Sequence, residues 1–433
     1  MIAGYCAYSI KHVRPQYLGI GMYRYKLGGQ ITETDVIRFS DTIENGTSPE
    51  YIILDCDKLK EMQEGLKRLF NALKSTNTIR ELSLGKTNNH VFGVRHMMSQ
   101  LSDVLAVNSS IQTLILDGDV FGPYCGIADM ERFSNALEVN TSIGGLILWN
   151  NEIGRRPGFL ERIADALSKN KRIHSLVISD NKLNETPSGL KYFSKFLEGN
   201  TTIRVLSLSY NGLGQCPEGM EYLSLALKTN NTIEDLDLGC NQFGQYPEST
   251  KFLSDALEFN STIKTLRLPN NRLGVFMFRD TGPICLGYLL EALKINKSIR
   301  MLDLYRNFIG TSPDPLWTRH ISNILGVNDV IQPDLFWMKF ISDVLKANVA
   351  IQNIHLEWDM FVDYPEGCSL IVDALTHNTS ITEVGLFDKC FCAQKPLKVI
   401  DDIADRNKHN NNLKESSLFE MMLPMLNECA HEG

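Results

Sequence analysis

The 433-residue sequence predicts an α/β solenoid with parallel strands on a concave face and helices on a convex face. The first observation behind this prediction is a period of thirty residues, because Ile203 recurs as Ile233 and Ile263 (233−203 and 263−233). The second is that each copy joins a short run of alternating leucines, typical of a strand, to a longer run with helical spacing. A strand and a helix therefore alternate along the chain.

The clearest copies match the pattern L-x-x-L-x-L-x-x-N-x-L of a leucine-rich repeat. Their shared positions are Ile203, Leu206, Leu208, Asn211, Leu213 and Gly214, then Ile233, Leu236, Leu238, Asn241, Phe243 and Gly244, then Ile263, Leu266, Leu268, Asn271, Leu273 and Gly274. Leucines two apart point to one face of a strand. Parallel strands stack about 4.8 Å apart whereas helices need roughly 10 Å, so we expect the stack to curve into a horseshoe.

Weaker copies precede and follow these repeats. We expect capping and degenerate repeats over 1–78, with helices over 34–45 and 61–73, and regular repeats over 79–328. Irregular repeats then occupy 329–407, and 408–433 forms a cap or tail with an amphipathic stretch over 416–429. One step shortens to twenty residues (351−331), and Pro333 cannot donate to a strand ladder. This unit should keep its helix, over 340–347, and lose most of its strand.

Two asparagines recur in each repeat. One follows the strand, where an amide can both donate and accept at a turn whose backbone groups would otherwise be buried without partners: Asn151, Asn181, Asn211, Asn241, Asn271 and Asn307. The other ends each helix, and we expect it to adopt the left-handed conformation: Asn108, Asn140, Asn170, Asn200, Asn230, Asn260, Asn296, Asn328, Asn348 and Asn378. Many of the latter read Asn-x-Ser/Thr, which we interpret as structural rather than as glycosylation acceptors.

Composition limits the functional classes. The net charge of −8 argues against nucleic acid as the main ligand. The sequence has no apolar stretch of eighteen residues and no N-terminal signal pattern, so we expect no membrane span and a cytoplasmic protein with reduced thiols.

The sequence offers no catalytic constellation. Gly85-Lys86-Thr87 matches the end of a phosphate-binding loop, but Arg80 stands where that loop needs its first glycine. His and Cys spacings fit neither a metal site nor a triad. We therefore expect no enzymatic activity, no cofactor and no metal.

Candidate binding residues are those that the strand period turns toward the concave face. They form an apolar zone of Ile115, Ile147, Trp149, Val177 and Val205, with Tyr210 at its edge. They also form a charged and aromatic zone of Asp235, Asp237, Arg267, Tyr305, Arg306, Glu357 and Trp358. Aromatic residues and arginine supply most interface hot spots, so both zones predict a protein partner. The alternative is that Ile and Val are there because they favour strands.

From 18 to 407 the chain resembles the ribonuclease-inhibitor-like class of leucine-rich repeat proteins, whose long units carry a full helix. In style it is closest to leucine-rich repeat effectors that intracellular bacteria deliver into host cells. The resemblance implies a non-enzymatic, monomeric scaffold that binds a host protein, in the cytoplasm or in a host cytosol without a cleavable signal peptide. Two alternatives are a GTPase-activating protein of the Ran-type leucine-rich repeat class and a self-associating structural array.

Overall fold

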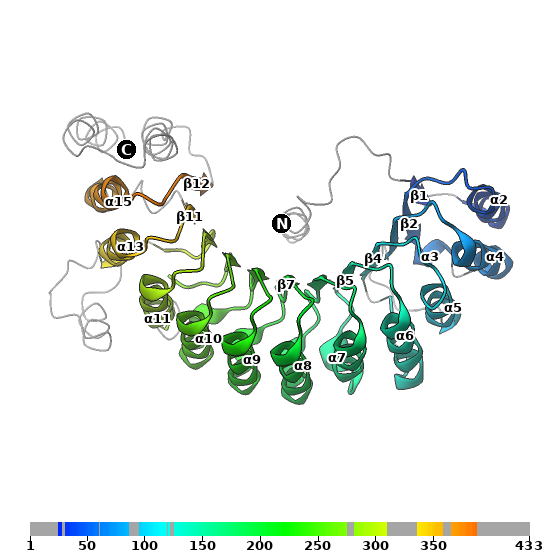
Figure 1. Ribbon diagram of the computed structural model, residues 1–433, viewed down its shortest axis with the longest axis horizontal. Coiled ribbons are helices and arrows are strands. Elements are labelled where there is room, and N and C mark those ends of the chain that lie inside the picture. The colour runs from blue at the N-terminus through cyan, green and yellow to red at the C-terminus, as the bar shows by residue number, and fades with distance from the viewer. Residues whose placement is uncertain are drawn as a thin grey trace. The chain divides into compact units, whose positions relative to one another are not determined.

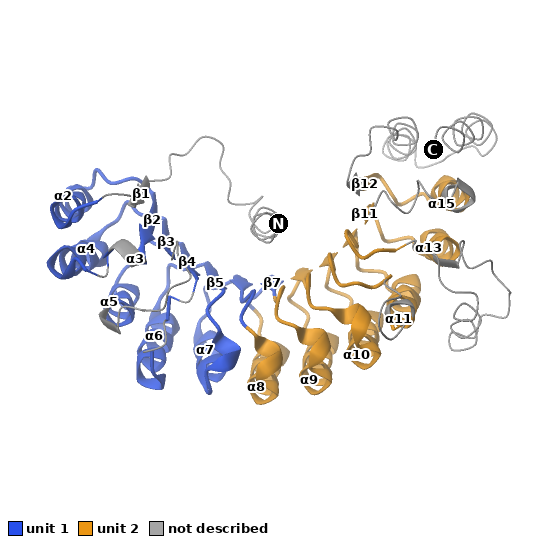
Figure 2. Ribbon diagram, turned by 180° about the vertical axis from the view of Figure 1, so that it is seen from behind, with its two compact units in different colours: residues 1–181, 202–207 blue, residues 182–201, 208–433 orange. Residues whose placement is uncertain are grey.

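The computed structural model describes residues 25–27, 31–59, 61–85, 95–118, 120–121, 125–274, 281–309, 336–357 and 365–387. The chain divides into two compact units, shown in different colours in Figure 2: unit 1 comprises 1–181 and 202–207, and unit 2 comprises 182–201 and 208–433. The boundary between the two units falls inside the regular repeats predicted over 79–328. The four segments predicted from the sequence therefore remain a prediction. The cap predicted over 408–433 lies outside the described residues.

Unit 1 alternates strands with helices. Its strands are β1 (Tyr25–Leu27), β2 (Tyr51–Asp55), β3 (Glu81–Gly85), β4 (Thr113–Asp117), β5 (Gly145–Trp149), β6 (Ser175–Val177) and β7 (Val205–Ser207). Its helices are α2 (Glu33–Glu44), α3 (Cys56–Leu59), α4 (Gln63–Ser75), α5 (Arg95–Leu105), α6 (Ile127–Val139) and α7 (Phe159–Lys169), with a 3-10 turn at Ile153–Arg155. Helices α2 and α4 confirm the two predicted near the N-terminus.

Unit 2 follows the same plan. Its strands are β8 (Asp235–Asp237), β9 (Thr265–Arg267), β10 (Met301–Asp303), β11 (Asn353–Glu357) and β12 (Glu383–Phe387). Its helices are α8 (Pro187–Gly199), α9 (Pro217–Thr229), α10 (Pro247–Phe259), α11 (Gly282–Ile295), α13 (Phe336–Ala347) and α15 (Pro365–His377), with 3-10 turns at Leu183–Glu185, Leu213–Gln215 and Phe243–Gln245. Proline begins α8, α9 and α10. It is well suited to this position because the N–H of the first helical residue would have no acceptor within the helix.

Each unit contains an open sheet whose strands lie in chain order, β1 to β7 and β8 to β12. Every strand pairing that the structure describes is parallel. Within each unit the helices lie on one side of the sheet (Figures 1 and 2). We call the opposite side the strand face. This architecture confirms the predicted α/β solenoid of the leucine-rich repeat type.

The repeated leucines form the core between sheet and helices. Leu206 and Leu208 are fully buried, as are Leu236 and Leu238 in the next repeat. Residues between these leucines point to the strand face, because side chains alternate along a strand. Burial of the leucines therefore determines which side chains of each strand face away from the core.

The asparagine that follows each strand forms the predicted ladder. The side-chain oxygen of Asn241 accepts from the backbone N–H groups of Asn211 (2.9 Å) and Leu213 (3.2 Å). Its Nδ2 donates to the carbonyls of Leu208 and Leu238, each at 3.0 Å. One buried amide thus satisfies backbone groups of two repeats.

The asparagine at the end of each helix has a different conformation from the one predicted. Asn260 is extended, with φ −70° and ψ 129°, and Asn140, Asn170 and Asn230 are likewise extended. Its Nδ2 donates to the Leu227 carbonyl (2.7 Å), and its Oδ1 accepts from the N–H groups of two following residues, including Ile263 (2.9 Å). The predicted left-handed conformation was wrong. Asparagine occupies this position because its amide makes hydrogen bonds between repeats, and these bonds require an extended backbone.

The Asn-x-Ser/Thr pattern follows from the same geometry. The hydroxyl of Thr262, two residues after Asn260, donates to the carbonyl of Asn230 in the preceding repeat at 3.3 Å. Asn260 itself is buried. The pattern therefore supports the structural interpretation over glycosylation at this position.

The left-handed conformation occurs instead in the turn after the strand. Asn150, Asp180, Tyr210, Asn270 and Arg306 have φ between 53° and 59°. The recurring spacing also brings a glycine against the next repeat: a methyl group on Gly214 would lie 2.8 Å from the Asn241 carbonyl oxygen. These turns are therefore set by close packing between repeats.

Strand β10 pairs directly with β11, the next described strand after the irregular unit predicted at Ile331. Met301 of β10 pairs directly with Asn353 of β11, although fifty-two residues separate them (353−301). Helix α13 confirms the helix predicted over 340–347. The predicted loss of the strand falls at Ile331, outside the described residues. The side chain of Asn348 restores the helix-end ladder by donating to the Asn296 carbonyl (2.9 Å).

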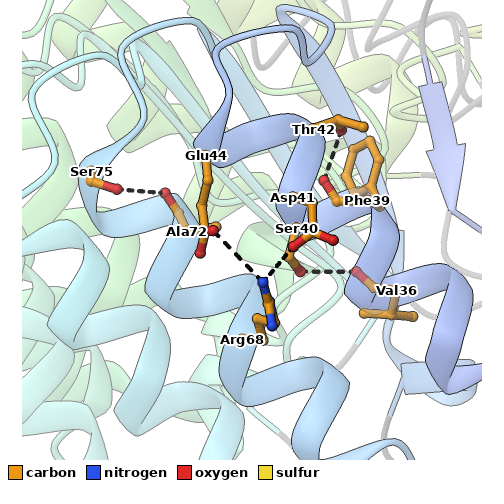
Figure 3. Close-up of polar contacts among 9 residues, drawn as sticks. All are labelled: Val36, Phe39, Ser40, Asp41, Thr42, Glu44, Arg68, Ala72 and Ser75. Atoms are coloured by element: carbon orange, nitrogen blue, oxygen red, sulfur yellow. Dashed lines mark hydrogen bonds and ion pairs between the residues drawn. The ribbon is translucent and has the colours of Figure 1, made fainter.

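Neighbouring helices are joined by ion pairs and by contacts between lysines and aromatic rings. In unit 1, Arg68 of α4 contacts Asp41 (2.5 Å) and Glu44 (3.9 Å) of α2 (Figure 3). In unit 2, lysines lie over aromatic rings of the following helix, as Lys191 lies 5.4 Å from the centre of the Tyr222 ring. Partly exposed pairs of these kinds each contribute about 1 kcal/mol or less.

Candidate protein-binding face

Strand-face residues form rows that run across neighbouring strands. The middle row of unit 1 contains Ser83, Ile115, Ile147, Val177 and Ser207, each paired in register with the next. The middle row of unit 2 contains Asp237, Arg267, Asp303 and His355. The two rows therefore differ sharply in character, as the predicted zones do.

The structure brings together the strand residues of the predicted apolar zone. Ile147 on β5 pairs with Ile115 on β4 and with Val177 on β6. Trp149 lies two residues further along β5, and Val205 lies in the neighbouring row on β7. Tyr210, predicted at the edge of the zone, belongs to unit 2.

The apolar zone is less exposed than the sequence predicts. Ile115 and Val177 are only 6% and 5% exposed, whereas Ile147, Trp149 and Val205 are partly exposed. Strands about 4.8 Å apart place side chains of one row in contact, and such contacts contribute to the burial of Ile115 and Val177. The surface available to a partner therefore centres on Ile147, Trp149 and Val205.

The predicted charged zone contains an ion pair in unit 2. Arg267 on β9 donates from its guanidinium to the carboxylate of Asp235 on β8, and Arg267 pairs in register with Asp237. Burial raises the pKa of Asp235 above its usual value, although the Arg267 guanidinium opposes this change. Asp237 and Arg267 are buried, so their charges lie in a region of low dielectric.

Asp303 and His355 extend this charged row, and the sequence-based selection of site residues missed both. Asp303 is 1% exposed, and its Oδ1 accepts from the Tyr305 N–H at 3.0 Å. Its Oδ2 has no hydrogen-bond partner and lies 3.9 Å from His355 Nδ1. Their strand positions point to the strand face, but only the register across the long insertion places His355 beside Asp303.

Tyr305 and Arg306 lie at the end of the same strand region. The Arg306 guanidinium lies 5.3 Å from the centre of the Tyr305 ring, and its Nε donates to the Tyr305 hydroxyl at 3.1 Å. Tyr305 is buried and Arg306 partly exposed. The Glu357 side chain and Trp358 lie outside the described residues.

Within the described part of the chain, no three His, Cys, Asp or Glu side chains are grouped to hold a metal ion. No helix in that part is long and apolar enough to cross a membrane.

Comparison of the chain with protein-family models and with curated proteins finds no match. Among solved structures, the chain is similar to one titled Leiomodin-1 Actin-Binding Site 2. That alignment has 12% sequence identity and a TM-score of 0.22, and it covers 63% of this chain and 95% of the other. A likeness at this level carries no inference about a partner or an activity.

Proposed function

We propose that this chain is a non-enzymatic scaffold that binds a protein partner on its strand face. The observation that carries the proposal is the position of Trp149, a large aromatic residue partly exposed on β5 beside the partly exposed Ile147. Buried aromatic anchors contribute much of the free energy of protein association.

The surroundings of Trp149 support this role. Asn151, immediately after β5, donates from Nδ2 to the Trp149 carbonyl (2.8 Å) and to the Leu116 carbonyl (2.9 Å). The backbone that carries Trp149 is therefore held by the asparagine ladder, and a backbone fixed before binding loses less entropy on association. The charged row of unit 2 would add selectivity for a partner of complementary charge.

The resemblance to ribonuclease-inhibitor-like repeat proteins, in the style of bacterial effectors, suggests the class of partner. We propose a host protein, bound by a monomer in the cytoplasm or in a host cytosol. This part of the proposal rests on the recurring Asn-x-Ser/Thr-Ile sequence between each helix and the next strand.

Partner capture from host-cell lysate tests the proposal when matched variants are compared. Trp149→Ala should lose a partner that the wild type retains. Phe259→Ala removes an aromatic side chain that is 66% exposed on α10, on the helix side, and should retain that partner. Equal capture by Trp149→Ala and the wild type would overturn the assignment of Trp149.

A second assay tests the non-enzymatic part of the proposal. GTP hydrolysis by a panel of small GTPases, including one of the Ran type, should proceed at the same rate with and without the protein. Acceleration by the wild type would contradict the proposal and favour the GTPase-activating class.

A further inference from the structure

Three large apolar side chains are exposed where consecutive helices of unit 2 end. Phe259 at the end of α10 is 66% exposed, Ile295 at the end of α11 is 51% exposed, and Val349, two residues after α13, is 70% exposed. Helices α10, α11 and α13 lie side by side (Figure 1). We call the last turn of each helix together with the residues that lead to the next strand the helix-end edge, which comprises 256–264, 292–300 and 344–352.

The asparagines at the helix ends hold the backbone of this edge. Asn296 donates from Nδ2 to the Asn260 carbonyl (3.0 Å), and Asn348 donates from Nδ2 to the Asn296 carbonyl (2.9 Å). All three asparagines are buried. Each is adjacent in sequence to one of the exposed apolar residues, so the three apolar residues are carried by one hydrogen-bonded ladder.

A cationic side chain accompanies each of the three apolar residues. Lys228 Nζ lies 5.6 Å from the centre of the Phe259 ring. Lys297 is exposed two residues after the apolar residue of α11, and Arg300 Nη1 donates to the carbonyl of Ala350, which follows the exposed valine (3.3 Å). Among the residues that the structure describes, none pairs as a carboxylate with these three cations.

The edge has a positive charge, although the whole chain has a net charge of −8. The three edge segments and the corresponding end of α9, 226–234, contain an excess of four cations (6−2): Lys228, Lys264, Lys294, Lys297, Arg300 and Lys346 against Glu234 and Glu258. Two further carboxylates outside these segments, Glu291 and Asp373, pair with Lys294 (2.5 Å) and Lys346 (2.6 Å). When both are counted, an excess of two cations remains (6−4).

We propose that the helix-end edge of unit 2 binds the surface of an anionic membrane, with its apolar side chains among the lipids and its cations at the lipid phosphates. This surface is separate from the strand face, and the inference goes beyond the proposed function. Apolar residues beside lysine and arginine are typical of proteins that lie on anionic bilayers. Helices pack about 8–10 Å apart, so the three apolar side chains are separated from one another. Fluid lipid can surround each of them, whereas anchors in a protein interface cluster in packed pockets.

Co-sedimentation of the full chain with phosphatidylcholine vesicles, prepared with and without phosphatidylserine, tests this inference. The wild type should bind the vesicles that contain phosphatidylserine at least roughly tenfold more tightly, because each cation near an anionic surface favours binding. Phe259→Ser/Ile295→Ser should weaken this binding at least roughly tenfold. Val139→Ser is the control and should bind as the wild type does, because Val139 is 58% exposed at the end of α6 but 136–144 contains no lysine or arginine.

Equal binding to the two kinds of vesicle, or binding to neither, would overturn the inference. Unchanged binding by a Phe259→Ser/Ile295→Ser variant that is folded by circular dichroism would also overturn it, as would an equal loss in Val139→Ser. If the double variant does not fold, unchanged binding by Lys297→Gln/Arg300→Gln, at two exposed positions, overturns the inference instead. Trp149→Ala tests the proposed function separately, since it should bind the vesicles as the wild type does.

Discussion

The side-chain oxygen of Asn271 accepts a 2.8 Å hydrogen bond from the backbone N–H of Asn241, one repeat earlier in the chain. Asn241 makes the equivalent bond to Asn211 and donates from Nδ2 to two leucine carbonyls. Each of these amides is buried and connects consecutive repeats. The asparagine ladder thus holds the turns that follow the strands.

Asn241→Ala should lower the free energy of unfolding by about 2–4 kcal/mol, because it leaves several buried backbone groups without partners. Denaturant unfolding followed by circular dichroism measures this change. Asn184→Ala, at an exposed bond to Gln215 (3.3 Å), should change the free energy by less than about 0.5 kcal/mol. Similar losses in the two variants would contradict the role of the ladder.

Asn260→Gly distinguishes the extended conformation from the left-handed one. Glycine would be well tolerated at a left-handed position, but here it removes the amide that joins Leu227 to Ile263. We expect a loss of about 2–4 kcal/mol, similar to that of Asn260→Ala. A neutral effect of glycine in the same denaturation assay would restore the left-handed interpretation.

Gly244→Ala should be strongly destabilising, because its methyl group would overlap the carbonyl of Arg272 in the next repeat. We expect a loss of about 2–4 kcal/mol from the backbone shift that this overlap forces. Gly199→Ala provides the control at the end of α8, where nothing lies within 4 Å of the added methyl group. This control should be neutral or stabilising by up to about 1 kcal/mol.

Cys285 should make stability depend on alkaline pH. Burial of its thiol raises the pKa from 9.0 to about 12. The protonated thiol therefore contributes stability that is complete below pH 9 and is lost as pH rises toward 12. Relative to Cys285→Ala, the wild type should lose about 2 kcal/mol between pH 8.5 and 10.5.

Ser254→Ala is the control, because Ser254 is buried on α10 and its hydroxyl does not ionise in this pH range. The difference in stability between the wild type and this variant should not change with pH. A constant difference between the wild type and Cys285→Ala over this range would contradict the raised pKa.

Leucine spacing predicted the strands, helices and core, because burial of Leu206 and Leu208 depends only on which face of a strand they occupy. The exposure of Ile115 and Val177 could not be predicted in this way, since it depends on neighbours in other repeats. The structure places Ile115, Ile147 and Val177 side by side, but the accessible part of the predicted zone is smaller than expected.

Long-range contacts explain the other differences. Asn260 has a high intrinsic preference for left-handed turns, but hydrogen bonds to the preceding repeat require an extended backbone. Similarly, the thirty-residue period cannot align Asp303 with His355, because fifty-two residues separate these paired positions (355−303). Intrinsic preferences and spacing predict local structure, whereas these positions are determined by contacts between repeats.

Photo-crosslinking of the captured partner tests the central claim most directly. The photoreactive residue p-benzoylphenylalanine would replace Trp149 on the strand face or Phe259 on the helix side, so that each change exchanges one aromatic residue for another. We expect a covalent adduct from position 149 and none from position 259. An adduct from position 259 alone would contradict binding on the strand face.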